Sequence, residues 1–262
     1  MHKSPVSRPM RQALPSDANG LSHKLQADMT IPTKTMPQLT VYRGFAVASC
    51  HVWSPFVNKL EARLRFAGVS YQIAMGSLQQ APRGKIPYLD IQDGGSHELL
   101  GDTGLITKRL VDDGVLLDFN ADLTPTLRAQ DLAIRALFED KLSFFLARER
   151  WIDNFYTMRG GVLSSLPYIA QLLIGRLAHR AMVRTLHGQG AGRYTTEEAS
   201  KFKLEVWESL NALLAESRSN TVAVAVRSQD PEAPFWVLGR SEPTEADATV
   251  YGFLAASLIC DA

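Results

Sequence analysis

The sequence has few cysteines, no long apolar run and almost no net charge. Its two cysteines, Cys50 and Cys260, form no CxxC motif and no metal-ligand spacing, so no metal site is expected and a reducing compartment is favoured over a disulfide framework. The most apolar stretch, Leu166 to Met182, is interrupted by two arginines and a histidine, so no transmembrane segment is expected. A formal net charge of +1 gives no field that would attract nucleic acid.

What is present fits a folded protein of one large or two smaller domains. The 262 residues include 45% hydrophobic and 21% charged residues, as in globular proteins. The segment from Met1 to Pro37 has no hydrophobic periodicity and contains several prolines, so it is predicted to be a disordered tail. A weak transit peptide is the alternative, which the prolines disfavour because they oppose an amphipathic helix.

Residues 38–114 are predicted to form an α/β unit. The first helical connection favours parallel pairing of the strands that flank it. Asp93-Gly94-Gly95 predicts a tight turn between antiparallel strands. The expected elements are strands at Leu39–Ala46, Ser70–Met75, Tyr88–Ile91 and His97–Leu100, and helices at Pro55–Ala67 and Thr103–Val111, the last with Asp102 at its N-cap.

Residues 124–262 are predicted to be mostly helical. Apolar residues recur at three- and four-residue spacings through most of this region. Alternation at Thr221–Val226 predicts a short strand, which Phe235–Leu238 could pair with. The expected helices are Pro125–Trp151, Leu163–Leu186 with a bend at Pro167, a helix from Thr195 or Thr196 to about Glu216, and a last helix that starts at the capping box Thr244–Asp247.

The stretch Trp53-Ser54-Pro55-Phe56-Val57 joins the first strand to the first helix. Ser54 stands where an N-cap belongs, and Pro55 occupies the first helical position, where its missing N–H costs nothing. The free N–H groups of a helix N-terminus favour a small anion. Ser54 therefore either only caps the helix or also holds and activates a thiolate.

Four motifs in order resemble the glutathione S-transferase superfamily over residues 39 to 262. Trp53–Val57 resembles the active-site turn of serine-type members, particularly the plant tau class. Lys85-Ile86-Pro87 resembles the family's turn with a cis proline, and Gly101-Asp102-Thr103 its acid–hydroxyl pair. Thr244–Asp247 resembles the capping box of the central helix of the helical domain. The resemblance implies a thioredoxin-like N-terminal domain at 38–114 and an all-α C-terminal domain at 124–262.

Within the superfamily, the sequence is most similar to the failed-axon-connections and metaxin-like branch and its fungal relatives. The similar segments are Pro82–Pro87, Gly190–Tyr194 and Trp236–Asp247. Many members of that branch have cysteine where this chain has Val57, so no thiol-based role is expected there. The chain ends at Ala262, where relatives usually continue for another short helix, which raises the alternative of a truncated helical domain.

The resemblance implies a glutathione site with a role for each motif. Ser54 would donate a hydrogen bond to the glutathione sulfur and lower the pKa of its thiol. Ile86 would offer its backbone N–H and C=O to the cysteinyl part, with Pro87 in the cis form exposing them. Asp102 and Thr103 would hold the γ-glutamyl end. Lys85 or Arg83 would pair with the glycyl carboxylate, although Lys85 could equally be a solvated turn residue and Asp102 only a cap.

The expected function is conjugation or transformation of a small hydrophobic electrophile with glutathione as co-substrate, in detoxification or secondary metabolism. A homodimer in the cytoplasm is expected, with mitochondrial association as an alternative. The alternative from another class is a non-catalytic, metaxin-like interaction protein. A disulfide reductase is disfavoured because the chain lacks a CxxC motif.

Overall fold

The computed structural model describes residues 36–44, 51–164, 166–228 and 234–260. Residues Met36–Ala262 form one compact unit. The predicted disordered tail, apart from Met36 and Pro37, lies outside the described residues, as does Cys50. The predicted boundary between two domains, at residues 114–124, stays a prediction.

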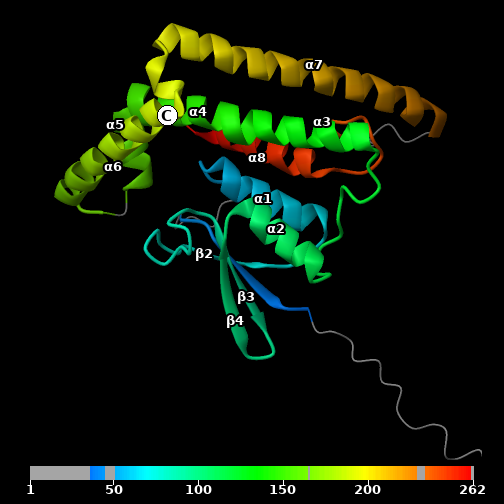
Figure 1. Ribbon diagram of the computed structural model, residues 1–262, viewed down its shortest axis with the longest axis horizontal. Helices are drawn as coiled ribbons and strands as arrows, with labels where there is room; N and C mark the ends of the chain where they lie inside the picture. Colours follow the sequence, from blue (N-terminus) through cyan, green and yellow to red (C-terminus); the bar gives the residue numbers. More distant parts are fainter. Residues whose placement is uncertain (1–35, 45–50, 165, 229–233, 261–262) are drawn as a thin grey trace, which may run out of the picture. The chain divides into compact units, whose positions relative to one another are not determined.

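A four-stranded mixed sheet forms the N-terminal part of this unit (Figure 1). The strands are β1 (Gln38–Tyr42), β2 (Gln72–Ala74), β3 (Tyr88–Asp93) and β4 (Ser96–Gly101), in the order β2-β1-β3-β4. The parallel pairing of β1 with β2 and the antiparallel pairing of β3 with β4 were predicted from the sequence. The antiparallel pairing of β1 with β3 was not predicted. Gly94 and Gly95, both at positive φ, form the two-residue turn between β3 and β4, a conformation that favours glycine at both positions.

Helices α1 (Pro55–Phe66) and α2 (Thr103–Asp112) cover one face of this sheet (Figure 1). Alternate residues of β1 point to the same face and meet the apolar side of each helix. The first hydrophobic core is therefore built from the sheet and both helices; its buried members include Leu39, Val41, Leu60, Leu64, Leu89, Ile106 and Leu110. This βαβ–ββα arrangement is thioredoxin-like and confirms the predicted fold of the N-terminal part.

The chain then becomes helical, with two corrections to the predicted helices. Where one helix was expected at Pro125–Trp151, two π-helical segments interrupt the run: α3 (Pro125–Ala136), η1 (Leu137–Leu142), α4 (Ser143–Arg148) and η2 (Glu149–Asp153). The helix predicted at Leu163–Leu186 is α6 (Tyr168–Gln189), which starts later than predicted, and a separate helix that was not predicted, α5 (Phe155–Val162), precedes it. Pro167 lies at the N-cap of α6, because proline cannot continue a helix from the preceding turn.

The predicted strand at Thr221–Val226 is wrong. After the short 3₁₀ turn η3 (Ala191–Arg193), helix α7 runs from Thr196 to Ser228 and includes this segment. Alternating valines favour a strand locally, but no proline or glycine stands between Glu216 and Ser228 to end the helix. Residues 235–238 form no strand either. None of the described helices is both long and apolar enough to cross a membrane.

The last helix, α8 (Glu245–Ile259), packs along α1 and so joins the helical part to the thioredoxin-like part. Its predicted capping box is confirmed: the Thr244 N–H donates to Asp247 Oδ2 at 2.8 Å. The other oxygen, Asp247 Oδ1, accepts from the Val237 N–H at 2.7 Å and ties the preceding loop to the helix. Burial raises the pKa of the Asp247 carboxyl, and the backbone donors oppose that shift.

Candidate functional site

The strand register brings the predicted binding motifs to one end of the sheet. Tyr42, the last residue of β1, pairs with Tyr88 at the start of β3, and Tyr88 pairs with Gly101 at the end of β4. The Lys85-Ile86-Pro87 turn precedes Tyr88, and Asp102 and Thr103 follow Gly101, so both motifs lie at this end. The Ile86–Pro87 peptide bond is cis, as the resemblance implied.

Ser54 caps α1 at the same end of the sheet. Its Oγ accepts a hydrogen bond from the Val57 N–H at 3.4 Å, and its side chain is half-buried. Within the described part of the chain, no hydrogen bond donated by this hydroxyl is found, so its hydrogen is available to a ligand. The turn before it is fixed by Asn58, whose amide group bonds both the N–H and the C=O of Val52, at 3.0 and 2.8 Å.

Asp102 has a strained backbone at the N-terminus of α2. Its φ of 79° makes it the single non-glycine residue at positive φ among the described residues. Oδ1 accepts from the N–H groups of Gly104 and Leu105, at 3.0 and 3.2 Å, while the residue as a whole is exposed. Thr103 beside it is buried. Strained residues of this kind cluster at ligand sites, which favours a binding role beyond capping.

The cis-proline turn offers backbone groups and two cations. Ile86 is half-buried and packs against Gly44, where an added Cβ would lie 2.5 Å from Ile86 Cδ1. A residue larger than glycine at 44 would therefore displace Ile86. Lys85 and Arg83 are exposed, and Arg83 lies beside Gly101, with its Cγ 3.4 Å from the position of an added Cβ.

One residue beside the Ser54 turn was not predicted. Arg150, in the π-helical segment η2, is buried and donates from Nη1 to the carbonyl oxygen of Trp53 at 2.7 Å. It also donates from Nη2 to the carbonyl oxygen of Ala256 in α8 at 3.2 Å. Helical periodicity did not single it out, because a π-helical turn shifts the face on which a side chain lies.

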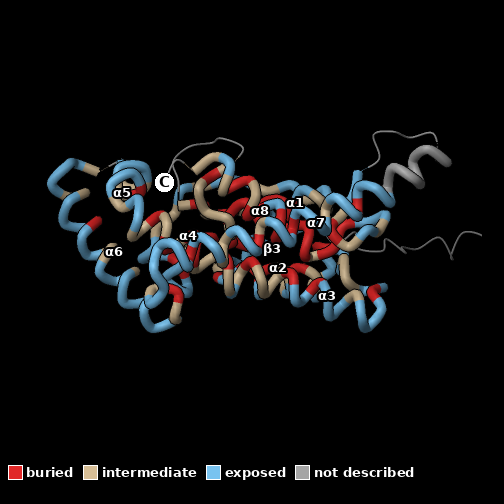
Figure 2. The backbone as a smooth tube through the Cα atoms, turned by 90° about the horizontal axis from the view of Figure 1, so that it is seen from above, coloured by how far each residue is buried: buried red, intermediate tan, exposed pale blue. Residues whose placement is uncertain are grey.

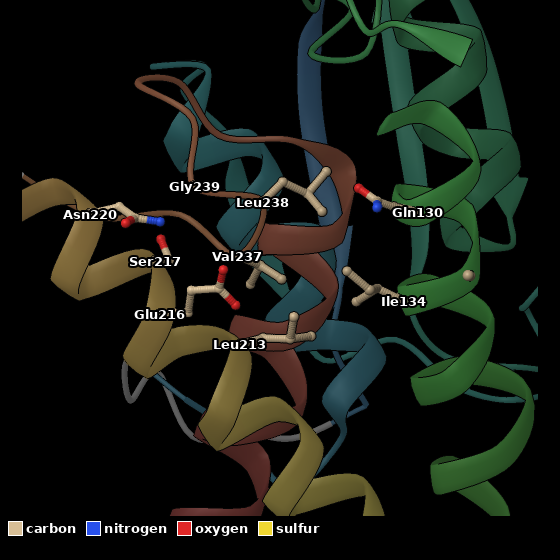
Figure 3. A pocket seen from close by; sticks show the side chains of 10 residues that line it. Gln130, Ile134, Leu213, Glu216, Ser217, Asn220, Val237, Leu238 and Gly239 are labelled. Carbon is tan, nitrogen blue, oxygen red and sulfur yellow. The ribbon is translucent and has the colours of Figure 1, made fainter. Parts of the chain in front are cut away.

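A cavity of about 380 Å³ lies away from these motifs, between α3, α7 and the loop before α8 (Figure 3). Ile134, Leu213 and Val237 give it apolar walls, and Glu216 and Asn220 give it polar edges. Neither Ser54 nor the motifs at residues 85–87 and 102–103 line it. We therefore do not assign the predicted site to this cavity. In the described ranges, no cluster of three or more metal-ligating side chains is found.

Comparison with known proteins finds similarity over part of the chain. Residues 55–157 match the family described as glutathione S-transferase N-terminal domain. The chain is similar to isoprene-epoxide glutathione S-transferase of Rhodococcus sp. (strain AD45), with 31% identity over 163 residues. That similarity covers 57% of this chain and 64% of the relative, so the chain matches less than two thirds of the relative's length.

Two solved structures with similarity to this chain are a glutathione transferase and a maleylacetoacetate isomerase. Glutathione transferase GSTFuA3 from Phanerochaete chrysosporium shares 14% identity and a TM-score of 0.49, with 86% of each chain covered. Maleylacetoacetate isomerase from Anaeromyxobacter dehalogenans shares 16% identity and a TM-score of 0.40, with 86% of this chain and 79% of the other covered.

Neither the metaxin-like branch nor the tau-like serine turn is confirmed by these comparisons. The broader resemblance agrees with both the matched region and the observed fold. Residues 55–157 match the N-terminal domain model, and a thioredoxin-like sheet is followed by a mostly helical part. Residues 55–157 are therefore similar to the glutathione S-transferase N-terminal domain, and the thioredoxin-like fold of the N-terminal part agrees with that similarity.

Proposed function

We propose that this protein is a glutathione transferase that joins the glutathione sulfur to a small hydrophobic electrophile. The observation that carries the proposal is the register Tyr42–Tyr88–Gly101. This register places the cis-proline turn next to the strained Asp102, at the end of the sheet where β1 ends. Ser54 follows β1 along the chain. The match of residues 55–157 to the glutathione S-transferase N-terminal domain supports the same conclusion.

The name of the Rhodococcus relative makes a small apolar epoxide the first electrophile to test. In that reaction the glutathione thiolate would attack an epoxide carbon, forming a C–S bond while the C–O bond of the ring breaks. The resulting alkoxide would take a proton from solvent, so that atoms and charge balance. The protein's task is to supply the thiolate at neutral pH.

Ser54 would supply the thiolate by donating its hydroxyl hydrogen to the sulfur. Its oxygen already accepts from the Val57 N–H, which orients the hydroxyl while leaving that hydrogen to be donated. A hydrogen bond to the charged form lowers a thiol pKa, and the N-terminus of α1 adds its partial positive charge. Capping and catalysis are therefore compatible roles for the same side chain.

Asp102, Thr103 and Ile86 would hold the peptide part of glutathione. The exposed Asp102 carboxylate would accept from the α-ammonium group of the γ-glutamyl end, with the N-terminus of α2 facing its carboxylate. The backbone of Ile86 would pair with the cysteinyl part as an added strand would. Lys85 or Arg83 would pair with the glycyl carboxylate, since both are exposed at this turn.

Calorimetric titration with glutathione tests the site directly, with two variants designed around the caps. Asp102→Asn keeps the N-cap and tolerates positive φ, but it removes the charge, so binding should weaken by at least about tenfold. Ser54→Ala should still bind glutathione but leave the pKa of its thiol near the ordinary value of about 8.5. The pKa is read from thiolate absorbance in the ultraviolet as pH is varied.

Thr124→Ala is the matched control for Ser54→Ala. Thr124 also caps a helix that begins with proline, and its hydroxyl accepts from the Leu127 N–H at 3.3 Å. Both variants should lose about 1 kcal/mol of stability, but only Ser54→Ala should change the thiol pKa. If the folded wild type binds no glutathione, the transferase proposal fails, and a non-catalytic interaction protein becomes the better candidate.

The finer parts of the proposal are a homodimer, a cytoplasmic location and a role in detoxification or secondary metabolism. Ultracentrifugation tests the homodimer. A screen of epoxides and other electrophiles shows which substrates are used and so tests the role in detoxification or secondary metabolism.

A further inference from the structure

Arg150 joins three parts of the chain that are distant in sequence. Its guanidinium bonds the Trp53 carbonyl, immediately before Ser54, and the Ala256 carbonyl near the end of α8. The arginine itself belongs to η2 in the helical part. One buried side chain therefore connects the turn that carries Ser54 to the helical part of the protein.

The Trp53 side chain is held by the same part of the chain. An added Cβ at Gly161 of α5 would lie 2.0 Å from Trp53 Cη2, so the indole ring rests directly on this glycine. The carbonyl and the ring of Trp53 are thus both fixed by residues between 150 and 161. Ser54 is the next residue, so the fixed position of Trp53 also limits where the Ser54 hydroxyl can lie.

From this geometry we infer that Arg150 is a positioning residue that fixes the Ser54 turn and brings a positive charge beside the thiolate site. The inference rests on the proposed function and deepens it. Because Nη1 and Nη2 each donate to a backbone carbonyl, these two hydrogen bonds do not depend on the identity of either partner side chain.

The charge itself has a chemical consequence beyond holding the loop. Burying a guanidinium is costly, and neutral side chains could bridge two carbonyls at lower cost. A cation bonded to the carbonyl of Trp53, the residue before Ser54, would favour the thiolate over the thiol, in addition to the hydrogen bond from the serine. Removing Arg150 should therefore affect thiol ionisation more than glutathione binding, because Asp102, Ile86 and Lys85 are proposed to hold the peptide part.

The test compares Arg150→Met and Arg150→Lys with Arg148→Met as a matched control. Arg148 is the same residue type, two positions earlier and equally buried, but it bonds Thr196 Oγ1 at 3.4 Å and pairs with Asp153 Oδ2 at 3.9 Å instead of contacting the Ser54 turn. Each full-length variant is examined by hydrogen exchange of residues 51–58 without ligand. Glutathione affinity, the pKa of the bound thiol and kcat/KM with an epoxide are then measured.

Arg150→Met should speed exchange in residues 51–58, raise the bound thiol pKa by about one unit and lower kcat/KM about 10- to 100-fold. Its glutathione affinity should change by no more than about threefold. Arg150→Lys keeps the charge but cannot make both hydrogen bonds in the same geometry. The thiol pKa should therefore return most of the way to the wild-type value, and the protection from exchange should recover less. Arg148→Met should change neither property.

Two results would overturn the inference. One is unchanged exchange in residues 51–58 of Arg150→Met. The other is faster exchange with an unchanged thiol pKa, which would reduce Arg150 to a purely structural residue. If the wild type itself binds no glutathione, the proposed function fails first, and the ligand-free exchange experiment still decides whether Arg150 fixes the turn.

Discussion

The interface between α1 and α8 and the outer face of α6 reverse the usual relation between polarity and burial. In the interface, charged side chains are buried: Lys59 bonds Glu139 at 2.6 Å, and Arg63 bonds Glu245 at 2.6 Å. On α6, large apolar side chains are exposed, with Ile169 at 72%, Leu173 at 65% and Leu177 at 66% exposure. Figure 2 shows the contrast between the buried tube around α1 and α8 and the exposed tube of α6.

Backbone proximity explains why the interface accepts charges. Gly252 of α8 lies so close to α1 that an added Cβ would meet the Lys59 nitrogen at 2.5 Å and the Pro55 oxygen at 2.6 Å. Beside this close contact, Lys59 of α1 reaches Glu139 in η1, and Arg63 reaches Glu245 at the start of α8. Stability in this region depends on a few specific contacts, whereas along the outer face of α6 few contacts are made.

The largest effect is expected for Lys59→Met. Glu139 would then keep only the Thr249 hydroxyl, 2.9 Å from its Oε1, as a partner among the described residues. Breaking a largely buried ion pair on one side should lower the free energy of unfolding by about 3 kcal/mol. Urea denaturation of the single variants and of Lys59→Met combined with Glu139→Leu checks this, because the double variant should recover part of the loss. Equal losses in the single and the double variant would mean that the pair is not coupled.

A glycine pair compares the two regions directly. Gly252→Ala should cost about 2 kcal/mol, since the methyl group would push α1 and α8 apart. Gly188→Ala, in α6, meets nothing within 4 Å and should stabilise the protein by up to about 1 kcal/mol through helix propensity alone. Thermal unfolding of both variants gives opposite signs if the interface is as tight as described. A stabilising Gly252→Ala would show that the two helices can separate at no cost.

The interface should also respond to pH through Glu245. Burial raises the pKa of this carboxyl above its ordinary value of 4.5, and the Arg63 guanidinium opposes the shift only in part. The native state then holds the proton more tightly than the unfolded chain, so this contribution to stability is complete below pH 4.5 and is lost as the pH rises through the raised pKa. The stability of the wild type relative to Glu245→Gln should therefore fall in denaturant titrations as the pH rises above 4.5. A constant difference would contradict the shift.

The smallest effect is expected on the outer face of α6. Leu177→Gln removes an exposed side chain and should change the free energy of unfolding by no more than about 0.5 kcal/mol. Leu60→Ala in the first core, where the leucine is 1% exposed, is the reference and should cost about 3 kcal/mol. A large loss in Leu177→Gln would show that this face is covered in solution.

Local signals made much of the fold and the candidate site predictable. The caps at Ser54 and Asp102, the capping box at Thr244 and the Gly94-Gly95 turn each depend on a few adjacent residues, and all are confirmed in the structure. The cis form of Pro87 came from the family resemblance and is also observed. The roles of these residues in binding and catalysis stay predictions.

The features that could not be predicted depend on contacts between residues far apart in the sequence. The valines at 222–226 favoured a strand, but continuity with the preceding helix prevailed. Hydrophobic periodicity gave no reason to bury Lys59 or Arg63, because their partners at 139 and 245 follow about 80 and 180 residues later. Arg150 was missed because a π-helical turn shifts the face on which its side chain lies.

The π-helical segment η2 makes the position of Arg150 depend on residue count. Each residue of an ordinary α-helix advances the side-chain direction by about 100°, and a π-helical turn takes up one extra residue without ending the helix. A shortened chain lacking one residue between 149 and 153 could keep the helix but would change its phase. A different side chain would then face the Trp53 carbonyl, so a single-codon deletion here should be more damaging to the Ser54 turn than most substitutions of the same residues.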